Sequence, residues 1–205
     1  MKNINHPSDT LPNDESRQTG LPLCSGDVSF VKEIQLTQGK VALVDDEDYE
    51  RVNQFKWYAN KLNKNKVLIW YAAKGIRNNI KPYKWTTMQM HRFILGITDP
   101  NILVDHKNHN GLDNRKCNLR VCTYSQNGMN RSPQTASSIY KGVSFYDCYK
   151  ERKWRAAIYL NGKMETIGFF YTEIEAAIAY NNRAIELYGE FAFLNVIIEQ
   201  ESKVN

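Results

Sequence analysis

The chain has 205 residues, of which 42% are hydrophobic and 24% charged, and this composition excludes a fibrous or wholly disordered protein. No apolar run reaches the roughly 18 residues that cross a bilayer. The N-terminal stretch MKNINHPSDTLPNDESRQTG lacks the apolar centre of a secretory signal. We therefore expect a cytoplasmic protein without membrane contact.

The cysteines agree with that location. Cys24, Cys117, Cys122 and Cys148 form no C-x-x-C pair. In a protein without an export signal, the simplest expectation is four reduced thiols. Cys117 and Cys122 could instead ligate zinc, but no second pair of ligands stands at a suitable spacing.

The N-terminal part of the chain indicates strands after a polar start. Residues 1–26 contain three prolines and show no periodicity, so we expect a disordered tail. Residues 27–90 predict a β-rich segment: strands FVKEIQLTQ and KVALVD around a turn at 38–40, and a hairpin of KWYANKL and KVLIWYAAKG around 63–65. DDEDYERVNQF begins with acidic residues, as a short helix does.

A basic and aromatic stretch runs from Arg51 to Thr98. It contains ten Lys or Arg residues and no Asp or Glu, and its net positive sign dominates the charge of +5 on the whole chain. The Trp and Tyr residues interleaved there are Trp57, Tyr58, Trp70, Tyr71, Tyr83 and Trp85. A surface of one charge sign attracts phosphate backbones, so we expect it to face nucleic acid. The alternative is a solvated basic surface beside an ordinary aromatic core.

Residues 104–127, VDHKNHNGLDNRKCNLRVCTYSQN, are rich in side-chain amides and poor in core residues. A metal-dependent phosphodiesterase needs an imidazole base, a hard divalent ion with oxygen ligands, and a group that fixes the imidazole tautomer. Asp105 adjoins His106, and Asn118 and Asn127 follow His106 by 12 and 21 residues. Neighbours in a strand face opposite sides, so Asp105 and His106 share a site only if the strand ends there, and the loop from Lys107 provides that end.

The motifs MHRFILG (90–96), VDHKNHNGLDNRKCNLR (104–120) and TYSQNGMN (123–130) resemble those of HNH endonucleases of the ββα-metal fold, in their phage and intron-encoded homing branch. The leader LTQGKVALVDDEDY also resembles that of such proteins. The resemblance implies that His106 is the general base and that Asn118 orients its ring. It further implies that Asp105 and Asn127 bind Mg²⁺ or Mn²⁺.

Two positions differ from the family pattern. His109 stands where the family usually has the glycine of an N-G step, and Asn127 stands where many members have a second metal-binding histidine. The resemblance also assigns DNA contacts to Arg115 and Arg120, with loop shaping as the alternative for Arg115. His91 is expected to be structural or to contact a phosphate. The remaining amides, expected to shape the loop, are Asn108, Asn110 and Asn114.

The small polar stretch RSPQTASS, residues 131–138, indicates a linker that separates a nuclease core at 91–130 from a C-terminal domain at 139–196. In that domain the strands IYKGVSFY, KWRAAIYL and KMETIGFF precede the helix TEIEAAIAYNNRAIELYG. An Asn-Gly turn joins the last two strands. The predicted helix caps are Thr172 with Glu175 at the start and Gly189 at the end. Residues 197–205 are expected to form a tail.

The C-terminal domain resembles an APETALA2-type DNA-binding domain in Y-x-G-V, K-W-x-A-x-I, I-G-x-F, E-A-A-x-A-Y and A-x-L-N. Strand alternation places Trp154, Ala156 and Ile158 on the face that packs on the helix. The family pattern assigns to the opposite, DNA-facing side Lys141, Ser144, Tyr146, Arg155, Tyr159, Met164 and Thr166. A bare scaffold for oligomerisation is the alternative.

Together these features predict an α+β chain with a ββα-metal nuclease core and a three-stranded antiparallel sheet on one helix. The resemblance implies a homing-type endonuclease of a prokaryotic or phage-infected cell, acting on double-stranded DNA and leaving 5′-phosphate and 3′-hydroxyl ends. One site per chain favours strand nicking, and no small-molecule cofactor is expected. A regulator with a degenerate HNH segment and a nuclease acting on RNA are the alternatives. The oligomeric state stays open.

Overall fold

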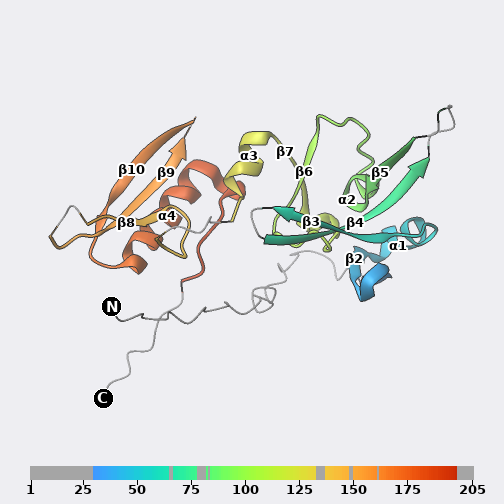
Figure 1. The fold of residues 1–205 in the computed structure, drawn as a ribbon, viewed down its shortest axis with the longest axis horizontal. Helices are drawn as coiled ribbons and strands as arrows, with labels where there is room; N and C mark the ends of the chain where they lie inside the picture. Colours follow the sequence, from blue (N-terminus) through green and yellow to red (C-terminus); the bar gives the residue numbers. More distant parts are fainter. Residues whose placement is uncertain are drawn as a thin grey trace, which may run out of the picture. The chain divides into compact units, whose positions relative to one another are not determined.

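The computed structural model describes residues 30–64, 67–77, 82, 84–132, 137–147, 150–160 and 162–197. They form an α+β fold of small antiparallel sheets and helices, as expected (Figure 1). The tail expected at 1–26, and all but the first residue of the tail expected at 197–205, lie outside the described residues.

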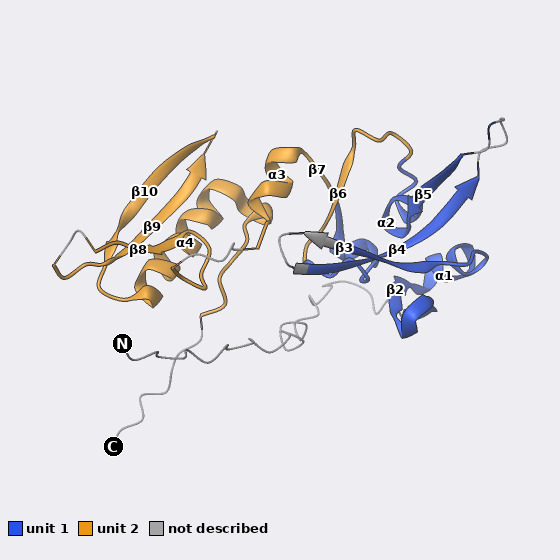
Figure 2. Ribbon diagram, in the orientation of Figure 1, with its two compact units in different colours: residues 1–97, 108–120 blue, residues 98–107, 121–205 orange. Residues whose placement is uncertain are grey.

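The chain gathers into two compact units (Figure 2). The first contains residues 1–97 and 108–120, and the second contains residues 98–107 and 121–205. Both units therefore contain parts of the segment expected to be the nuclease core, and each is described by itself. The division expected at residues 131–138 stays a prediction.

The first unit begins with the two predicted strands, β1 (Val31–Gln35) and β2 (Val41–Asp45), which pair antiparallel. The 3-10 turn η2 (Thr37–Gly39) joins them, and Gln38 has a φ of 62° there. The predicted helix follows as α1 (Asp46–Asn53), with three acidic residues in its first turn. Negative charge at that end is favourable because the helix dipole is positive there.

A three-stranded sheet follows, in the order β3 (Tyr58–Lys64), β4 (Val67–Arg77) and β5 (Trp85–Gln89). The hairpin of β3 and β4 is the predicted one, with Lys64 opposite Val67. MQMHRFILG, which predicted a strand or a helical turn, forms both, because β5 ends at Gln89 and the helix α2 (Met90–Ile94) begins at the next residue.

Part of the basic and aromatic stretch packs on itself. The Lys74 ammonium lies 3.1 Å from the ring centroid of Phe55, 4.3 Å from that of Phe93 and 5.2 Å from that of Trp57. Burial lowers the pKa of Lys74. The three rings can take the place of water around the Lys74 ammonium, because the face of an aromatic ring carries partial negative charge. Trp85, by contrast, is 71% exposed. The stretch thus contributes to the packing of the unit as well as to its surface.

The expected nuclease motif follows a strand–strand–helix order. Strand β6 (Leu103–His106) and strand β7 (Leu119–Cys122) form a two-stranded sheet, and the 3-10 turn η3 (Lys116–Asn118) leads into β7. Helix α3 (Tyr124–Met129) begins with a capping box in which Thr123 and Gln126 bond each other's backbone N–H groups. β6 ends at His106, which confirms the predicted end of the strand.

The second unit contains the predicted three-stranded antiparallel sheet on one helix. Its order is β10 (Lys163–Phe170), β9 (Trp154–Leu160) and β8 (Val143–Phe145). Helix α4 (Glu173–Tyr188) is capped by Thr172 and Glu175 and ends at Gly189, both as predicted, and the 3-10 turn η4 (Gly189–Phe191) follows. We call residues 137–197 the C-terminal module.

The face of β9 that packs on α4 is the predicted one. Ala156 is buried with Ala176 and Ala177, and Trp154 packs against this cluster. Ile158 is buried with Tyr180, Ala184 and Tyr188 of the helix. Small helix residues let the sheet approach closely, which explains the alanine-rich stripe.

The end of the module is fixed by a buried asparagine. Asn195 accepts a hydrogen bond from the Lys141 backbone N–H at 2.7 Å and donates to the Lys141 carbonyl at 3.0 Å. Its own backbone exchanges two further bonds with the Asn181 side chain, each 2.8 Å long. The residues after α4 thus return to the start of β8.

None of the helices in the described part of the chain is long and apolar enough to cross a membrane. Cys122 is a buried, reduced thiol. Cys117 is disulfide-bonded, so the expectation of reduced thiols is wrong for this residue. A disulfide depends on two cysteines meeting in space, which spacing along the chain does not reveal.

We predict that Gly142→Ala destabilises the C-terminal module by about 3 kcal/mol, because it combines a clash with an unfavourable φ. Gly142 has a φ of +75°, and an added Cβ would meet the Tyr180 ring and lie 2.6 Å from the Ala157 carbonyl oxygen. Urea unfolding measures the loss.

Gly162→Ala is the matched control. Gly162 has a φ of +78°, but an added Cβ meets no heavy atom of the described residues within 4 Å. It should cost only about 1 kcal/mol, for the φ alone. Equal losses in the two variants would contradict the close packing of Tyr180 on Gly142.

Candidate functional site

The asparagines of the motif build its loop by bonding their own backbone. The Asn108 side-chain oxygen accepts from the Asn110 N–H at 2.9 Å, and the Asn110 oxygen accepts from the Leu112 N–H at 3.0 Å. The Asn114 amide donates to the Leu112 carbonyl at 3.1 Å. Such local bonds are why Asn is favoured in turns. The predicted loop-shaping role of these three asparagines is confirmed.

Asp113 is the centre of the loop and is fully buried. Its carboxylate accepts two hydrogen bonds of 2.7 Å from Arg115 and one of 2.8 Å from the Asn108 amide. The bonds to Asp113 raise the pKa of Arg115, although burial opposes this. Arg115 therefore shapes the loop, one of its two expected roles, and its DNA contact stays a prediction. Arg120 is buried in β7, and its DNA contact stays a prediction too.

The loop is attached to β2, which sequence reasoning missed. The Leu43 N–H donates to the Leu112 carbonyl and the Leu43 carbonyl accepts from the Asn114 N–H, both at 2.8 Å. The Lys116 N–H donates to Asp45 at 2.7 Å, while its ammonium lies 3.0 Å from Asp48. The only available signal was the acidic start of α1, which predicted a helix cap rather than a partner for the motif.

Asn118 is fully buried beside Asp113. Its Nδ2 donates to the Asp113 carbonyl at 2.8 Å, and its Oδ1 accepts from the Asn108 N–H at 3.0 Å. An amide oxygen has two lone pairs, so these bonds are compatible with a further donor. Asn118 belongs to the first unit and His106 to the second. Its role toward His106 stays a prediction.

His109, which stands where the family pattern has a glycine, has a backbone conformation that favours glycine. Its φ is 63°, in the left-handed region where a Cβ is unfavourable. A glycine at this position would adopt the same φ without that cost. At Gly111 nearby a side chain is excluded, because an added Cβ would meet the Trp70 carbonyl oxygen and the Tyr71 ring.

The second unit holds Asp105 and His106, both buried at the end of β6. Asn130, itself only 4% exposed, donates from Nδ2 to the Asp105 carboxylate at 2.8 Å and to the His106 carbonyl at 3.3 Å. The Asn130 side-chain amide therefore bonds both Asp105 and His106. Sequence reasoning missed Asn130, although it closes the quoted motif TYSQNGMN.

Asn127, the second expected metal ligand, is exposed on α3. It precedes Asn130 by one helical turn, and residues three apart are neighbours on a helix surface. A carboxylate and an amide oxygen are hard donors that suit Mg²⁺ or Mn²⁺ completed by water. Across the described ranges no three His, Cys, Asp or Glu side chains gather as a ligand set. The metal-binding role of Asp105 and Asn127 stays a prediction.

Five of the seven expected DNA-facing residues lie on strands of the C-terminal sheet, and the register places them on one side. Arg155 is opposite Ser144, Tyr159 is opposite Met164, and Thr166 is opposite Ala157 in the register. Tyr159 is 64% exposed and Met164 49%. Residues at alternate positions of a strand share a face. Because Tyr159 and Met164 are exposed on this face, a ligand can reach it.

Arg155 lies along that side with its guanidinium 4.8 Å from the ring centroid of Tyr146. Its Nε is buried and has no hydrogen-bond partner in the described structure. Lys141 differs from the others because its ammonium donates to the Met129 carbonyl of α3 and lies 5.3 Å from the Phe193 ring. Burial, with the neighbouring charge of Arg131, lowers the pKa of Lys141 to about 8. DNA contacts of both residues stay predictions.

Two known proteins are similar to the chain. An uncharacterized HNH endonuclease of Acanthamoeba polyphaga mimivirus is 35% identical over 165 residues, which cover 78% of this chain and 77% of the relative. An AP2-like ethylene-responsive transcription factor of Arabidopsis thaliana is 37% identical over 68 residues, or 33% of this chain and 14% of the plant protein. No family model and no solved structure matches.

We predict that His109→Gly raises the free energy of unfolding by about 1 kcal/mol, because glycine adopts a positive φ without a Cβ penalty. His109→Ala is the control, since it removes the imidazole but keeps the Cβ. Denaturant titration of both variants measures the difference. An equal gain from the two would show that the imidazole, and not the backbone conformation, is responsible.

Proposed function

Because the chain belongs to the HNH endonuclease family, we propose that it is a metal-dependent endonuclease that nicks DNA. The observation that carries the proposal is the pair of hydrogen bonds from Asn130 to Asp105 and His106. They fix the Asp105 carboxylate and the backbone of His106 where β6 ends, which supports a site built on these two residues. We further propose the homing type, with 5′-phosphate and 3′-hydroxyl products.

In this proposal His106 is the general base. Its imidazole accepts the proton of the attacking water, because histidine is the side chain whose neutral form is available near pH 7. Asn118 orients the ring, and its own amide is fixed by Asp113 and Asn108. A base that is held in one orientation transfers a proton at lower entropic cost.

Asp105 and Asn127 are the proposed ligands of Mg²⁺ or Mn²⁺ in a ββα-metal core. When bound, the ion would hold the scissile phosphate and stabilise the departing 3′ oxygen. Asn130 would support the ligand set by fixing the Asp105 carboxylate, and it caps α3, the helix that bears Asn127.

We propose that the C-terminal module binds double-stranded DNA with the exposed side of its sheet. That side combines an arginine with exposed aromatic and apolar side chains, whereas α4 covers the other side. Arginine and backbone contacts position a duplex, and contacts to base edges select the sequence. The module would thereby select the DNA sequence at which the nuclease cleaves.

The first test of the function is nicking of supercoiled plasmid that carries the native locus, in the presence of Mg²⁺. Wild-type protein should produce nicked circles, and His106→Ala should do so about 10²- to 10⁴-fold more slowly, because a general base is lost. His6→Ala is the matched control and should nick at the wild-type rate. Gel densitometry over time gives the rates.

Two results would count against this assignment. Undiminished nicking by His106→Ala would show that another group is the base. An absence of nicking by wild-type protein that still binds DNA would favour the alternative, a DNA-binding regulator with a degenerate motif.

The second test concerns the DNA face. Arg155→Ala should weaken DNA binding and reduce the slope of log affinity against log salt by about 0.9, the value for one lost phosphate contact. Arg183→Ala is the control because Arg183 lies on α4, paired with Glu165 and Glu186. Fluorescence anisotropy at several salt concentrations measures both slopes. A slope for Arg155→Ala equal to that of wild type would exclude the sheet as the DNA face.

A further inference from the structure

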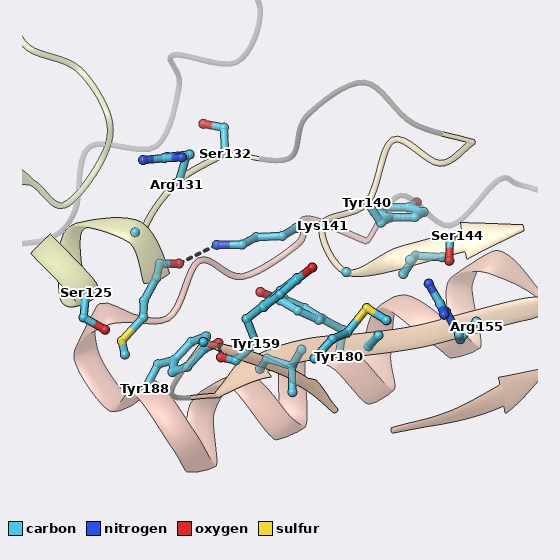
Figure 3. A pocket seen from close by; sticks show the side chains of 18 residues that line it. Ser125, Arg131, Ser132, Tyr140, Lys141, Ser144, Arg155, Tyr159, Tyr180 and Tyr188 are labelled. Carbon is cyan, nitrogen blue, oxygen red and sulfur yellow. Dashed lines mark hydrogen bonds between the residues drawn. The ribbon is translucent and has the colours of Figure 1, made fainter. Parts of the chain in front are cut away.

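A pocket of about 540 Å³ in the second unit is lined by residues of α3, of the C-terminal sheet and of α4 (Figure 3). α3 contributes Ser125 and Met129 to one wall, and Arg131 and Ser132 follow it. The sheet contributes Tyr159 among others. The wall from the nuclease motif and the wall from the sheet thus face one cavity. Pockets of this size accept ligands as large as a nucleotide.

The pocket has a positive lining. Lys141, Arg131 and Arg155 line it, and no Asp or Glu stands among the described residues around it. Three cations around one cavity repel one another, and an anion would relieve this repulsion. The buried Nε of Arg155 is a donor without a hydrogen-bond partner in the described structure. Charge therefore selects an anionic ligand.

The other part of the lining is apolar and aromatic. Tyr159 and Met164 are opposite each other in the strand register and are both largely exposed. Ala157 and Tyr180, both buried, line the same pocket. Rings and thioethers of this kind pack on the carbon atoms of a sugar. The pocket thus offers cations and an apolar floor together.

The wall formed by α3 is held in place before any ligand binds. The Met129 side chain packs against the buried cluster of Ile158, Tyr180 and Tyr188. The Met129 carbonyl, in the last turn of α3, accepts a hydrogen bond from the Lys141 ammonium, as Figure 3 shows. A pocket that is already formed loses little entropy on binding.

We propose that this pocket binds the sugar-phosphate backbone of one nucleotide of a DNA strand, with the phosphate between Arg131 and Lys141 and the deoxyribose over Tyr159 and Met164. The proposal rests on the proposed DNA-binding function. Its new content is the contribution of α3 and Arg131. The helix that bears Asn127 and the sheet then contact the same DNA strand.

A DNA strand is preferred to a free anion because the pocket continues onto the expected DNA face. Ser144, Arg155 and Met164 belong both to that face and to the lining of the pocket. A strand that crosses the sheet therefore reaches Arg131 without leaving the cationic surface. Inorganic phosphate shares the chemistry of the ligand but not this path, so it serves as the comparison.

The test uses the full-length His106→Ala protein and a short fluorescent DNA duplex. Arg131→Gln in this background should weaken binding and reduce the salt slope by about 0.9, since one phosphate contact is lost. Arg131 is exposed, so the variant should fold normally. Arg183→Gln removes one positive charge from the opposite side of the module and should leave the slope unchanged.

A second measurement follows the Lys141 ammonium by NMR of the methylated lysine. Saturating duplex should raise the pKa of Lys141 from about 8, because an anion favours the charged form. The groups that face Lys141 are the Arg131 guanidinium, the Phe193 ring and the Met129 carbonyl. Inorganic phosphate at the same phosphate concentration should produce a smaller shift.

The outcomes separate the two proposals. Failure of the His106→Ala parent to bind the duplex would overturn the DNA-binding function itself. Normal binding by the parent, with an unchanged salt slope in Arg131→Gln, would overturn the pocket alone. An unchanged pKa of Lys141 with saturating duplex, or an equal shift with inorganic phosphate, would also overturn it.

Discussion

The buried ion pair of Asp113 and Arg115 is the interaction on which the nuclease motif depends. Two buried charges are favourable only when the geometry is good and the remaining acceptors are satisfied. Here the guanidinium forms two bonds to one carboxylate, and the Asn108 amide adds a third. Loss of one partner would leave a buried charge without compensation, at a cost of about 3–5 kcal/mol. The pair therefore favours this conformation of the loop.

Hydrogen bonds of amide groups, rather than further ion pairs, connect the loop to Asn118 and to β2. The Asp113 carbonyl fixes the Asn118 side chain, and the loop bonds β2 on both sides of Asp113 through the backbone of Leu43. The N-terminal strands are thus part of the support of the motif, which gives a physical reason for the leader LTQGKVALVDDEDY to precede it. Lys116 completes the attachment with Asp45 and Asp48.

Sequence reasoning was accurate where the determining contacts are local. The capping box at Thr172 acts within three residues, and strand alternation fixed which side of β9 packs on α4. Two contacts that the sequence did not predict join residues far apart in the chain. They are the bond from Asn130 to Asp105 and the bond from the Lys141 ammonium to the Met129 carbonyl. Nothing in their spacing distinguishes such partners from solvent-exposed neighbours, because only the tertiary fold brings them together.

Helix α3 belongs to the nuclease motif in sequence, but it packs both on β6 and on the C-terminal module. A helix of six residues is unstable alone, because nucleation costs more than so few hydrogen bonds return. Asn130 ties its end to β6, whereas Met129 packs into the core of the C-terminal module and bonds Lys141 through its carbonyl. The position of Asn127 therefore depends on both contacts at once. A DNA strand bound as proposed at Lys141 and Arg131 would contact the helix that bears Asn127, the proposed metal ligand, and would add a third contact to the two that fix this helix.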